Sequence, residues 1–145
     1  MKILNKKLCI ASDHAGYDLK EFIKENLIKK GISIIDLGPN TNTSVDYPDF
    51  AKKVSKRVKF KKSDIGILVC GSGTGMAISA NKFKGVRAVV GYNATSTRLS
   101  RQHNNANILA LGSRLTKKKI VLKIISIFLN TKFEGGRHLR RVKKI

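Results

Sequence analysis

The sequence predicts an α/β protein of three layers, in which a five-stranded parallel sheet carries helices on both faces and is followed by a C-terminal tail. Short apolar runs rich in β-branched residues recur, and stretches with helical periodicity separate them. Strand and helix alternate five times without a repeat or linker, which is typical of a parallel sheet. A length of 145 residues suits one domain, so we expect a single domain over 1–145.

The first half of the chain supplies two strands and two helices. Residues 8–11 form the first apolar run, and residues 32–37 form the second, which the segment GPNTNTS closes. The helix predicted over 17–30 is amphipathic, with one apolar face made of Leu19, Phe22, Ile23, Leu27 and Ile28. A second helix is predicted over 48–58, because Pro48 in a first turn loses no hydrogen bond.

The second half supplies three more strand and helix pairs. The strands are predicted over 65–70, 86–92 and 108–112, and the helices over 75–83, 95–103 and 116–129. The remaining segment is rich in arginine and lysine. We expect residues 131–145 to form a basic tail that contributes to the functional site.

The net charge of +21 raises the question of nucleic-acid binding. The lysines are spread in pairs along the chain, and aromatic residues are few and do not interleave with them as stacking surfaces would. A non-enzymatic nucleic-acid-binding protein is therefore only a remote alternative. No Asp or Glu occurs between Ile65 and Phe133, so this half should attract small anions such as phosphate esters.

The two cysteines, Cys9 and Cys70, occur without a CxxC motif or a His/Cys cluster. This usage suits a reducing cytoplasm and predicts no structural metal. Apolar runs stay well short of the ~20 residues of a membrane span. The basic start of the chain leads into an apolar stretch that Asp13 and His14 break, so we expect neither a signal peptide nor a membrane partner.

The segment LVCGSGTGMAISANK carries the strongest chemical signal. Cys70 ends a predicted strand, and glycines follow at Gly71, Gly73 and Gly75. Glycines let backbone N–H groups approach a ligand closely, and the same groups favour a thiolate, so Cys70 is placed to act as a base or nucleophile. A tight strand–helix turn would also use glycine. The spacing matches neither a dinucleotide-binding fingerprint nor a P-loop, so no nucleotide is implied.

Four other short motifs hold polar side chains, namely SDHAG, DYP, RQHNNAN and GGRHLRR. Taken singly, each has a structural explanation as a surface histidine, a helix start or a solvated helical face. Together with DYPDFA, CGSGTGMAISANK, GVRA and HNNANILALGSR, in this order, they resemble ribose-5-phosphate isomerase B over nearly the full length. The resemblance implies a Rossmann-like fold and interconversion of ribose 5-phosphate and ribulose 5-phosphate through an enediolate, without metal or cofactor, in the pentose phosphate pathway.

The resemblance also implies roles for individual residues. Cys70 would move a proton between C2 and C1, and His103 would open the furanose ring. Asp13 would hold sugar hydroxyls with Tyr47 nearby. The loop of Gly71, Ser72, Gly73, Thr74 and Gly75 would cradle the enediolate. His14, Arg137 and Arg141 would take the phosphate, and Asn104 and Arg114 would complete the pocket. Isomerases of galactose 6-phosphate or allose 6-phosphate share this scaffold, so a six-carbon substrate remains the alternative.

One departure from the family concerns the base. Some relatives lack the cysteine and place a Glu just after the glycine loop, where this chain has Met76. Since Met76 cannot accept a proton, the thiol is the base candidate of this loop.

The positions of the two catalytic candidates in the predicted sheet imply an oligomer. Cys70 ends a strand, whereas His103 precedes one, so within one subunit they should lie at opposite ends of a parallel sheet. We therefore predict a homodimer, or a dimer of dimers, with active sites shared between subunits.

Overall fold

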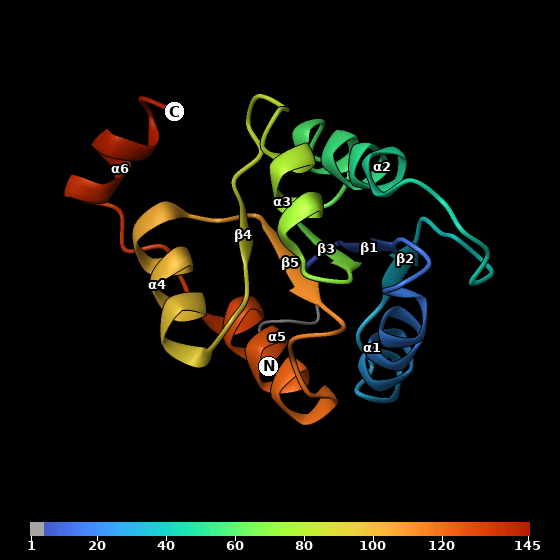
Figure 1. Ribbon diagram of the computed structural model, residues 1–145. Helices are drawn as coiled ribbons and strands as arrows, with labels where there is room; N and C mark the ends of the chain where they lie inside the picture. The colour runs from blue at the N-terminus through green and yellow to red at the C-terminus, as the bar shows by residue number, and fades with distance from the viewer. Residues whose placement is uncertain (1–4) are drawn as a thin grey trace.

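The computed structural model describes residues 5–145 and has three layers, with a sheet between two layers of helices (Figure 1). The strands are β1 (Leu8–Ser12), β2 (Ile34–Asp36), β3 (Ile65–Cys70), β4 (Ala88–Val90) and β5 (Ile108–Gly112). Their order is β2-β1-β3-β5-β4 and every pair is parallel, which confirms the predicted sheet. Residues 1–4, the basic start of the N-terminal stretch considered above, lie outside the described residues.

The helices are α1 (Tyr17–Lys29), α2 (Tyr47–Lys59), α3 (Thr74–Ala80), α4 (Ala94–Asn104), α5 (Lys118–Asn130) and α6 (Arg137–Val142). Helices α2 and α3 pack on one face of the sheet, while α1 and α5 cover the other face and α4 lies beside α5 (Figure 1). Within residues 5–145, none of these helices has the length and apolar character needed to cross a membrane.

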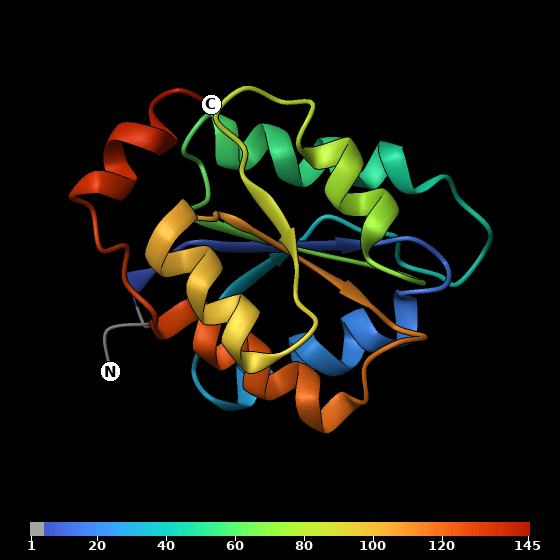
Figure 2. The same cartoon turned by 60° about the vertical axis from the view of Figure 1, so that its left-hand side comes forward.

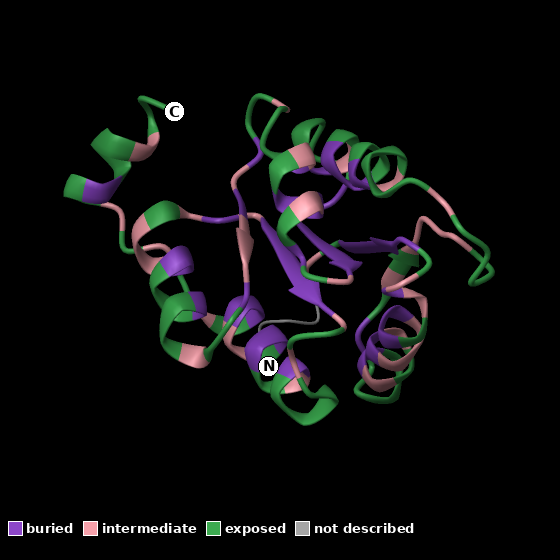
Figure 3. Ribbon diagram, in the orientation of Figure 1, coloured by how far each residue is buried: buried purple, intermediate pink, exposed green. Residues whose placement is uncertain are grey.

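The core is divided in two by the sheet, because successive side chains of a strand point to opposite faces. In β3, Ile67 and Val69 face α1 and α5, whereas Leu68 and Cys70 face α2 and α3. The strands β1, β3 and β5 are buried along their length (Figure 3). Cys70 therefore lies on the face of the sheet that α2 and α3 cover, at the end of a fully buried strand.

The two edge strands are shorter than the sequence predicts. The apolar runs 32–37 and 86–92 contain only three strand residues each, in β2 and β4. Both strands have a neighbour on one side alone, and single backbone hydrogen bonds to that neighbour continue past their ends, at Leu37 and at Gly91. β3 and β5, which are paired on both sides, have the predicted bounds.

The C-terminal tail contains the short helix α6, which packs against α4 (Figure 2). A helix of six residues is too short to be stable by itself. Contact with α4 holds it, including the stacked rings of His103 and His138, whose centroids lie 4.2 Å apart. The tail is therefore a structured part of the molecule.

Candidate active site

A cavity of about 250 Å³ lies at the carboxyl ends of β1, β3 and β5. From β1 the chain crosses to β2 on one side and then to β3 on the other, and ligands of open α/β sheets bind at such a switch point. The cavity is lined by Asp13, Tyr47, Cys70, Gly71, Ser72, Gly75, Arg114 and Leu115. Seven of the predicted site residues therefore come together within one chain.

Cys70 lies at the base of this cavity with 4% of its surface exposed. Its Sγ accepts a hydrogen bond from the N–H of Gly73 over 3.1 Å. Within residues 5–145, the N–H groups of Gly71, Ser72 and Gly75 make no hydrogen bond. The loop thus presents three free backbone donors beside a sulfur, which is an arrangement suited to an anionic ligand.

Two positions of this loop require glycine for different structural reasons. Gly73 has φ 80°, a left-handed conformation that side chains with a Cβ rarely adopt. At Gly75 a Cβ would lie 2.8 Å from two ring carbons of Tyr47, the first residue of α2. Gly73 therefore shapes the turn, and Gly75 allows the Tyr47 ring to close the cavity wall.

Asp13 and Arg114 provide opposite charges at the cavity. Asp13 is 7% exposed, and its Oδ1 accepts the N–H of Gly16 over 2.9 Å. Its Oδ2 makes no hydrogen bond within the described chain, so it is available to a ligand hydroxyl. Arg114 is exposed, and its guanidinium lies over Gly71.

His14, Gly73 and Thr74 lie at the same end of the sheet without lining the cavity. The His14 side chain is exposed, and its Nδ1 accepts the N–H of Val45 over 3.2 Å. Thr74 begins α3, and its N–H donates to Oγ of Ser72 over 3.2 Å. Thr74 therefore helps to fix the loop conformation through its backbone.

The remaining predicted residues form a second group at the opposite end of the sheet. His103 and Asn104 end α4, just before β5 begins, and Arg137 and Arg141 lie one turn apart on α6 (Figure 2). Cys70, in contrast, is paired with the last residue of β5. His103 and Cys70 of one chain therefore lie apart, and the predicted topology implied this separation.

The second group contains two side chains to which the sequence had assigned no role, Glu134 and His138. Nε2 of His138 lies 3.6 Å, and Nε2 of His103 lies 3.9 Å, from a carboxylate oxygen of Glu134. Partial burial, followed by the charges of His103 and Arg137, lowers the pKa of His138. His138 was visible in the motif GGRHLRR, but nothing in the sequence indicated that it stacks on His103.

Within residues 5–145, His103, Glu134 and His138 are also the one cluster of possible metal ligands, with ligand atoms within 4.8 Å of one another. Their geometry is poor for that purpose. The two imidazole rings stack with an angle of 11° between their planes. Lone pairs in two parallel, stacked planes do not converge on one ion, so binding a metal would require a ring to rotate.

Ser113 is a further residue that the sequence analysis missed. Its N–H donates to the carbonyl of Cys70 over 2.8 Å, and its Oγ donates to the carbonyl of Ala15 over 2.8 Å. It thereby ties together the three loops that follow β1, β3 and β5. No sequence signal identified it, because its partners are backbone carbonyls.

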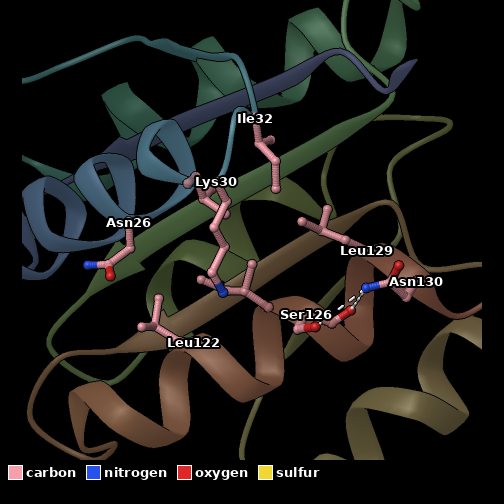
Figure 4. Close-up of a pocket in the computed structure, with 9 residues that line it drawn as sticks. Asn26, Lys30, Ile32, Leu122, Ser126, Leu129 and Asn130 are labelled. Carbon is pink, nitrogen blue, oxygen red and sulfur yellow. Dashed lines mark hydrogen bonds between the residues drawn. The ribbon is translucent and has the colours of Figure 1, made fainter. Parts of the chain in front are cut away.

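A different cavity, of about 270 Å³, lies between α1 and α5 (Figure 4). Its walls are mainly apolar, and Leu122 and Leu129 are among the residues that form them. Lys30 is the only titratable side chain among its lining residues. Since it offers no nucleophile or acid–base pair, it is not a candidate for chemistry.

Similarity to known proteins identifies the family of the chain. The profile of the Ribose/Galactose Isomerase family matches residues 8–145. The chain belongs to this family. Ribose-5-phosphate isomerase B of Escherichia coli (strain K12) is 43% identical over 140 residues, which are 97% of this chain and 94% of that protein.

Two solved structures extend the similarity to the fold. A ribose 5-phosphate isomerase from Thermotoga maritima has a TM-score of 0.95 at 48% identity, with 97% of each chain covered. Ribose-5-phosphate isomerase B from Mycoplasma genitalium, solved with bound ribulose-5-phosphate, has a TM-score of 0.92 at 45% identity. That match covers 97% of this chain and 94% of the other. The predicted family is thereby confirmed.

Proposed function

We propose that this chain is an aldose–ketose isomerase that interconverts ribose 5-phosphate and ribulose 5-phosphate. The observation that carries this proposal is the Cys70 thiol, which ends a buried strand in a cavity lined by free loop amides. Moving a proton next to a carbonyl requires a base and donors for the developing oxyanion. The names of the relatives, and the ribulose-5-phosphate bound in one of them, support the substrate.

The proposed reaction begins with ring opening, in which His103 takes the proton of the anomeric hydroxyl and delivers it to the ring oxygen as the C1–O bond of the ring breaks. The Cys70 thiolate then removes the proton from C2 of the open aldose. This leaves an enediolate, whose oxygen accepts hydrogen bonds from the N–H groups of Gly71 and Ser72. The thiol returns the same proton to C1 while the hydroxyl proton of O2 passes to O1, which completes the ketose, and Asp13 holds the sugar hydroxyls throughout. Removing one such donor commonly costs about 3 kcal/mol in the transition state.

The phosphate is assigned to Arg137, Arg141 and His14. In one chain, His14 lies at the opposite end of the sheet from the two arginines. Both arginines are exposed and share a face of α6, as residues four apart do. Guanidinium groups bind phosphate through paired hydrogen bonds, which fixes its orientation. Binding energy at the phosphate can thus position the reacting carbons.

The active unit in this proposal is a homodimer, or a pair of such dimers. Apolar side chains are exposed around the edge strand β4, with Ile78 at 61%, Tyr92 at 56% and Leu99 at 41%. A two-fold axis beside this edge would set the two sheets in opposite directions. The partner's His103 and its α6 would then approach Cys70, and each subunit would complete the other. An active monomer in light scattering would contradict this arrangement.

The test is a coupled assay with ribose 5-phosphate on the wild type, Cys70→Ala and Cys9→Ala. Cys9 is the matched control, because it is a buried cysteine that faces the same layer of helices. We expect Cys70→Ala to lose about 10²- to 10⁴-fold in kcat, as for loss of a general base, and Cys9→Ala to retain activity.

An unchanged rate in folded Cys70→Ala would exclude the thiol as the base, and no turnover by the wild type would exclude the substrate. Parallel assays with allose 6-phosphate and galactose 6-phosphate complete the comparison. A higher kcat/KM on either one would move the assignment to a six-carbon substrate and leave the chemistry in place.

A further inference from the structure

A cationic cavity of about 470 Å³ lies at the amino ends of β3, β4 and β5, away from the Cys70 cavity. It is bounded by the end of α2, the turn before β4 and the end of α4. The cations that line it are Lys6, Lys59, Lys61, Arg87 and Arg101. Neither Arg137 nor Arg141, the proposed phosphate ligands of the isomerase, is among its lining residues.

Two guanidinium groups converge within this cavity on one residue. Nε of Arg87 donates to the carbonyl of Asn105 over 2.9 Å, and Nη1 of Arg101 donates to Oδ1 of Asn105 over 3.2 Å. Asn105 follows α4 in a left-handed conformation with φ 48°, and both its backbone carbonyl and its Oδ1 accept from the arginines. The Nη2 atoms of both arginines make no hydrogen bond to residues 5–145, so two donors remain for a ligand.

The two arginines have no carboxylate to balance them. Among residues 5–145, no Asp or Glu oxygen lies within 4.0 Å of either guanidinium. Asp64, the acidic residue that lines the cavity, already accepts the N–H of Lys7 over 2.8 Å. Arg101 is only 9% exposed, and a cation at that burial normally has an ionic partner.

The lowered pKa values of the cations at this cavity agree with the absence of a carboxylate beside the arginines. Burial lowers the pKa of Arg87, and burial followed by the charge of Arg87 lowers that of Arg101. Burial and then the charge of Arg101 lower the pKa of Lys6 as well. Burial is the main cause of all three shifts, and the mutual repulsion of cations adds to it at Arg101 and Lys6; a bound anion would reduce both costs.

A purely structural role accounts for only part of the arrangement. Arg101 anchors the chain beyond α4 and α5, because its side chain donates to the carbonyls of Ala106 and Thr131. That role requires one cation. Arg87 has a similar role, since it donates to the carbonyls of Asn105 and Gly85, but neither role explains why Lys6 and Lys59 line the same space.

We propose that this cavity binds a small anion that carries two or more linked phosphate groups. Arginine forks and lysine ammonium groups are the side chains that recognise phosphate. None of the described residues that line the cavity is aromatic, so they offer no surface for stacking a base, and recognition is confined to the phosphates. The assignment is independent of the isomerase chemistry, which uses other residues.

The test is calorimetric titration of the full chain with pyrophosphate as the probe. Arg87→Gln removes one guanidinium from the cavity while keeping a side chain of similar length. Lys52→Ala/Lys53→Ala is the matched control, because it removes two exposed charges from the same helix that supplies Lys59. We expect Arg87→Gln to weaken binding by at least about tenfold, and the control to change it by less than about twofold.

Two further variants separate the possible sites. Arg137→Ala/Arg141→Ala should bind pyrophosphate as tightly as the wild type, and loss of binding there would assign the anion to the isomerase site. Lys59→Ala, at an exposed position of the cavity rim, should weaken binding about threefold. It also replaces Arg87→Gln if that variant does not fold. Equal binding by the wild type and both cavity variants would overturn the proposal.

Discussion

The two ends of the sheet present different kinds of ligand-binding groups. At the carboxyl end, the groups are mainly backbone amides and a nearly buried thiol, held in a loop fixed by β3, β5 and α3. At the amino end, they are side chains on the ends of α4 and α6, and the arginines of α6 are exposed. The carboxyl end is thus preorganised by the core, whereas the amino end depends on side chains at the surface.

The two ends of the sheet suit different parts of the proposed reaction. Stabilising an enediolate requires donors that do not reorganise during the reaction, and fixed backbone amides meet this requirement. Ring opening and phosphate binding require charges that reach the substrate from outside, which side chains of the partner can supply. The two ends are complementary, and a two-fold dimer is the simplest assembly that joins them.

The largest expected effect tests whether the ends act in different chains. Cys70→Ala and His103→Ala should each lose about 10²- to 10⁴-fold in kcat. When the two inactive variants are unfolded together and refolded as a mixture, half of the dimers carry one intact site. We expect recovery of about a quarter of wild-type activity. The measurement is the coupled assay after refolding.

The control for this experiment is a mixture of Cys70→Ala with Cys70→Ala/His103→Ala, in which no dimer has an intact site. Absence of recovery in the first mixture, with dimers present by light scattering, would show that both groups act within one chain.

The second prediction compares two glycines with the same left-handed backbone conformation, one at each end of the sheet. Gly73 has φ 80° and Gly85 has φ 87°, so alanine strains the backbone at both. A Cβ at Gly73 would lie 3.1 Å from the backbone of Leu111, whereas one at Gly85 would have no atom within 4 Å. Each variant should lose about 1–2 kcal/mol of stability, but only Gly73→Ala should lose kcat, by about tenfold or more.

Urea unfolding and the coupled assay measure these two quantities separately. Equal loss of kcat in both variants would indicate a general effect of destabilisation, and would weaken the assignment of the loop to the oxyanion.

The smallest expected effect concerns the support of the carboxyl end. Asp36 bonds Lys20 at 2.7 Å and Lys24 at 2.6 Å, and its Oδ1 accepts the N–H of Gly38. Burial alone would raise the pKa of Asp36, but the hydrogen bonds of Lys20, Lys24 and Gly38 hold it below its usual range. The carbonyl of Gly38 in turn accepts the N–H of Ser12, which precedes the site residue Asp13.

Asp36→Asn should therefore lower the free energy of unfolding by about 1–3 kcal/mol at pH 7. The stabilisation from a carboxylate with a lowered pKa is present above its unfolded pKa of about 4, and is lost as the pH falls through the folded value. The difference between wild type and variant should hence shrink below about pH 4. Urea unfolding at pH 7 and pH 3 measures it, with exposed Glu25→Gln as the control. A difference that does not depend on pH would contradict the ionic role.

The sequence predicted the regular parts of this molecule well, for a physical reason. The strand 65–70 and the strand 108–112 are apolar along their length, because both faces of a covered parallel sheet are buried. Helix α6 was predicted only as a tail, since a six-residue helix depends on a contact with α4 that no local pattern records.

By itself, the sequence determined the alternation of strands and helices, the thiol at the end of a buried strand and the glycines that follow it. These features are local, and periodicity or backbone freedom records them in neighbouring residues. Only the tertiary structure decided that Ser113 ties three loops, that His138 stacks on His103, and that Arg87 and Arg101 meet at Asn105. Such contacts join different segments of the chain, and their energy depends on distance and burial, which no short stretch of sequence contains.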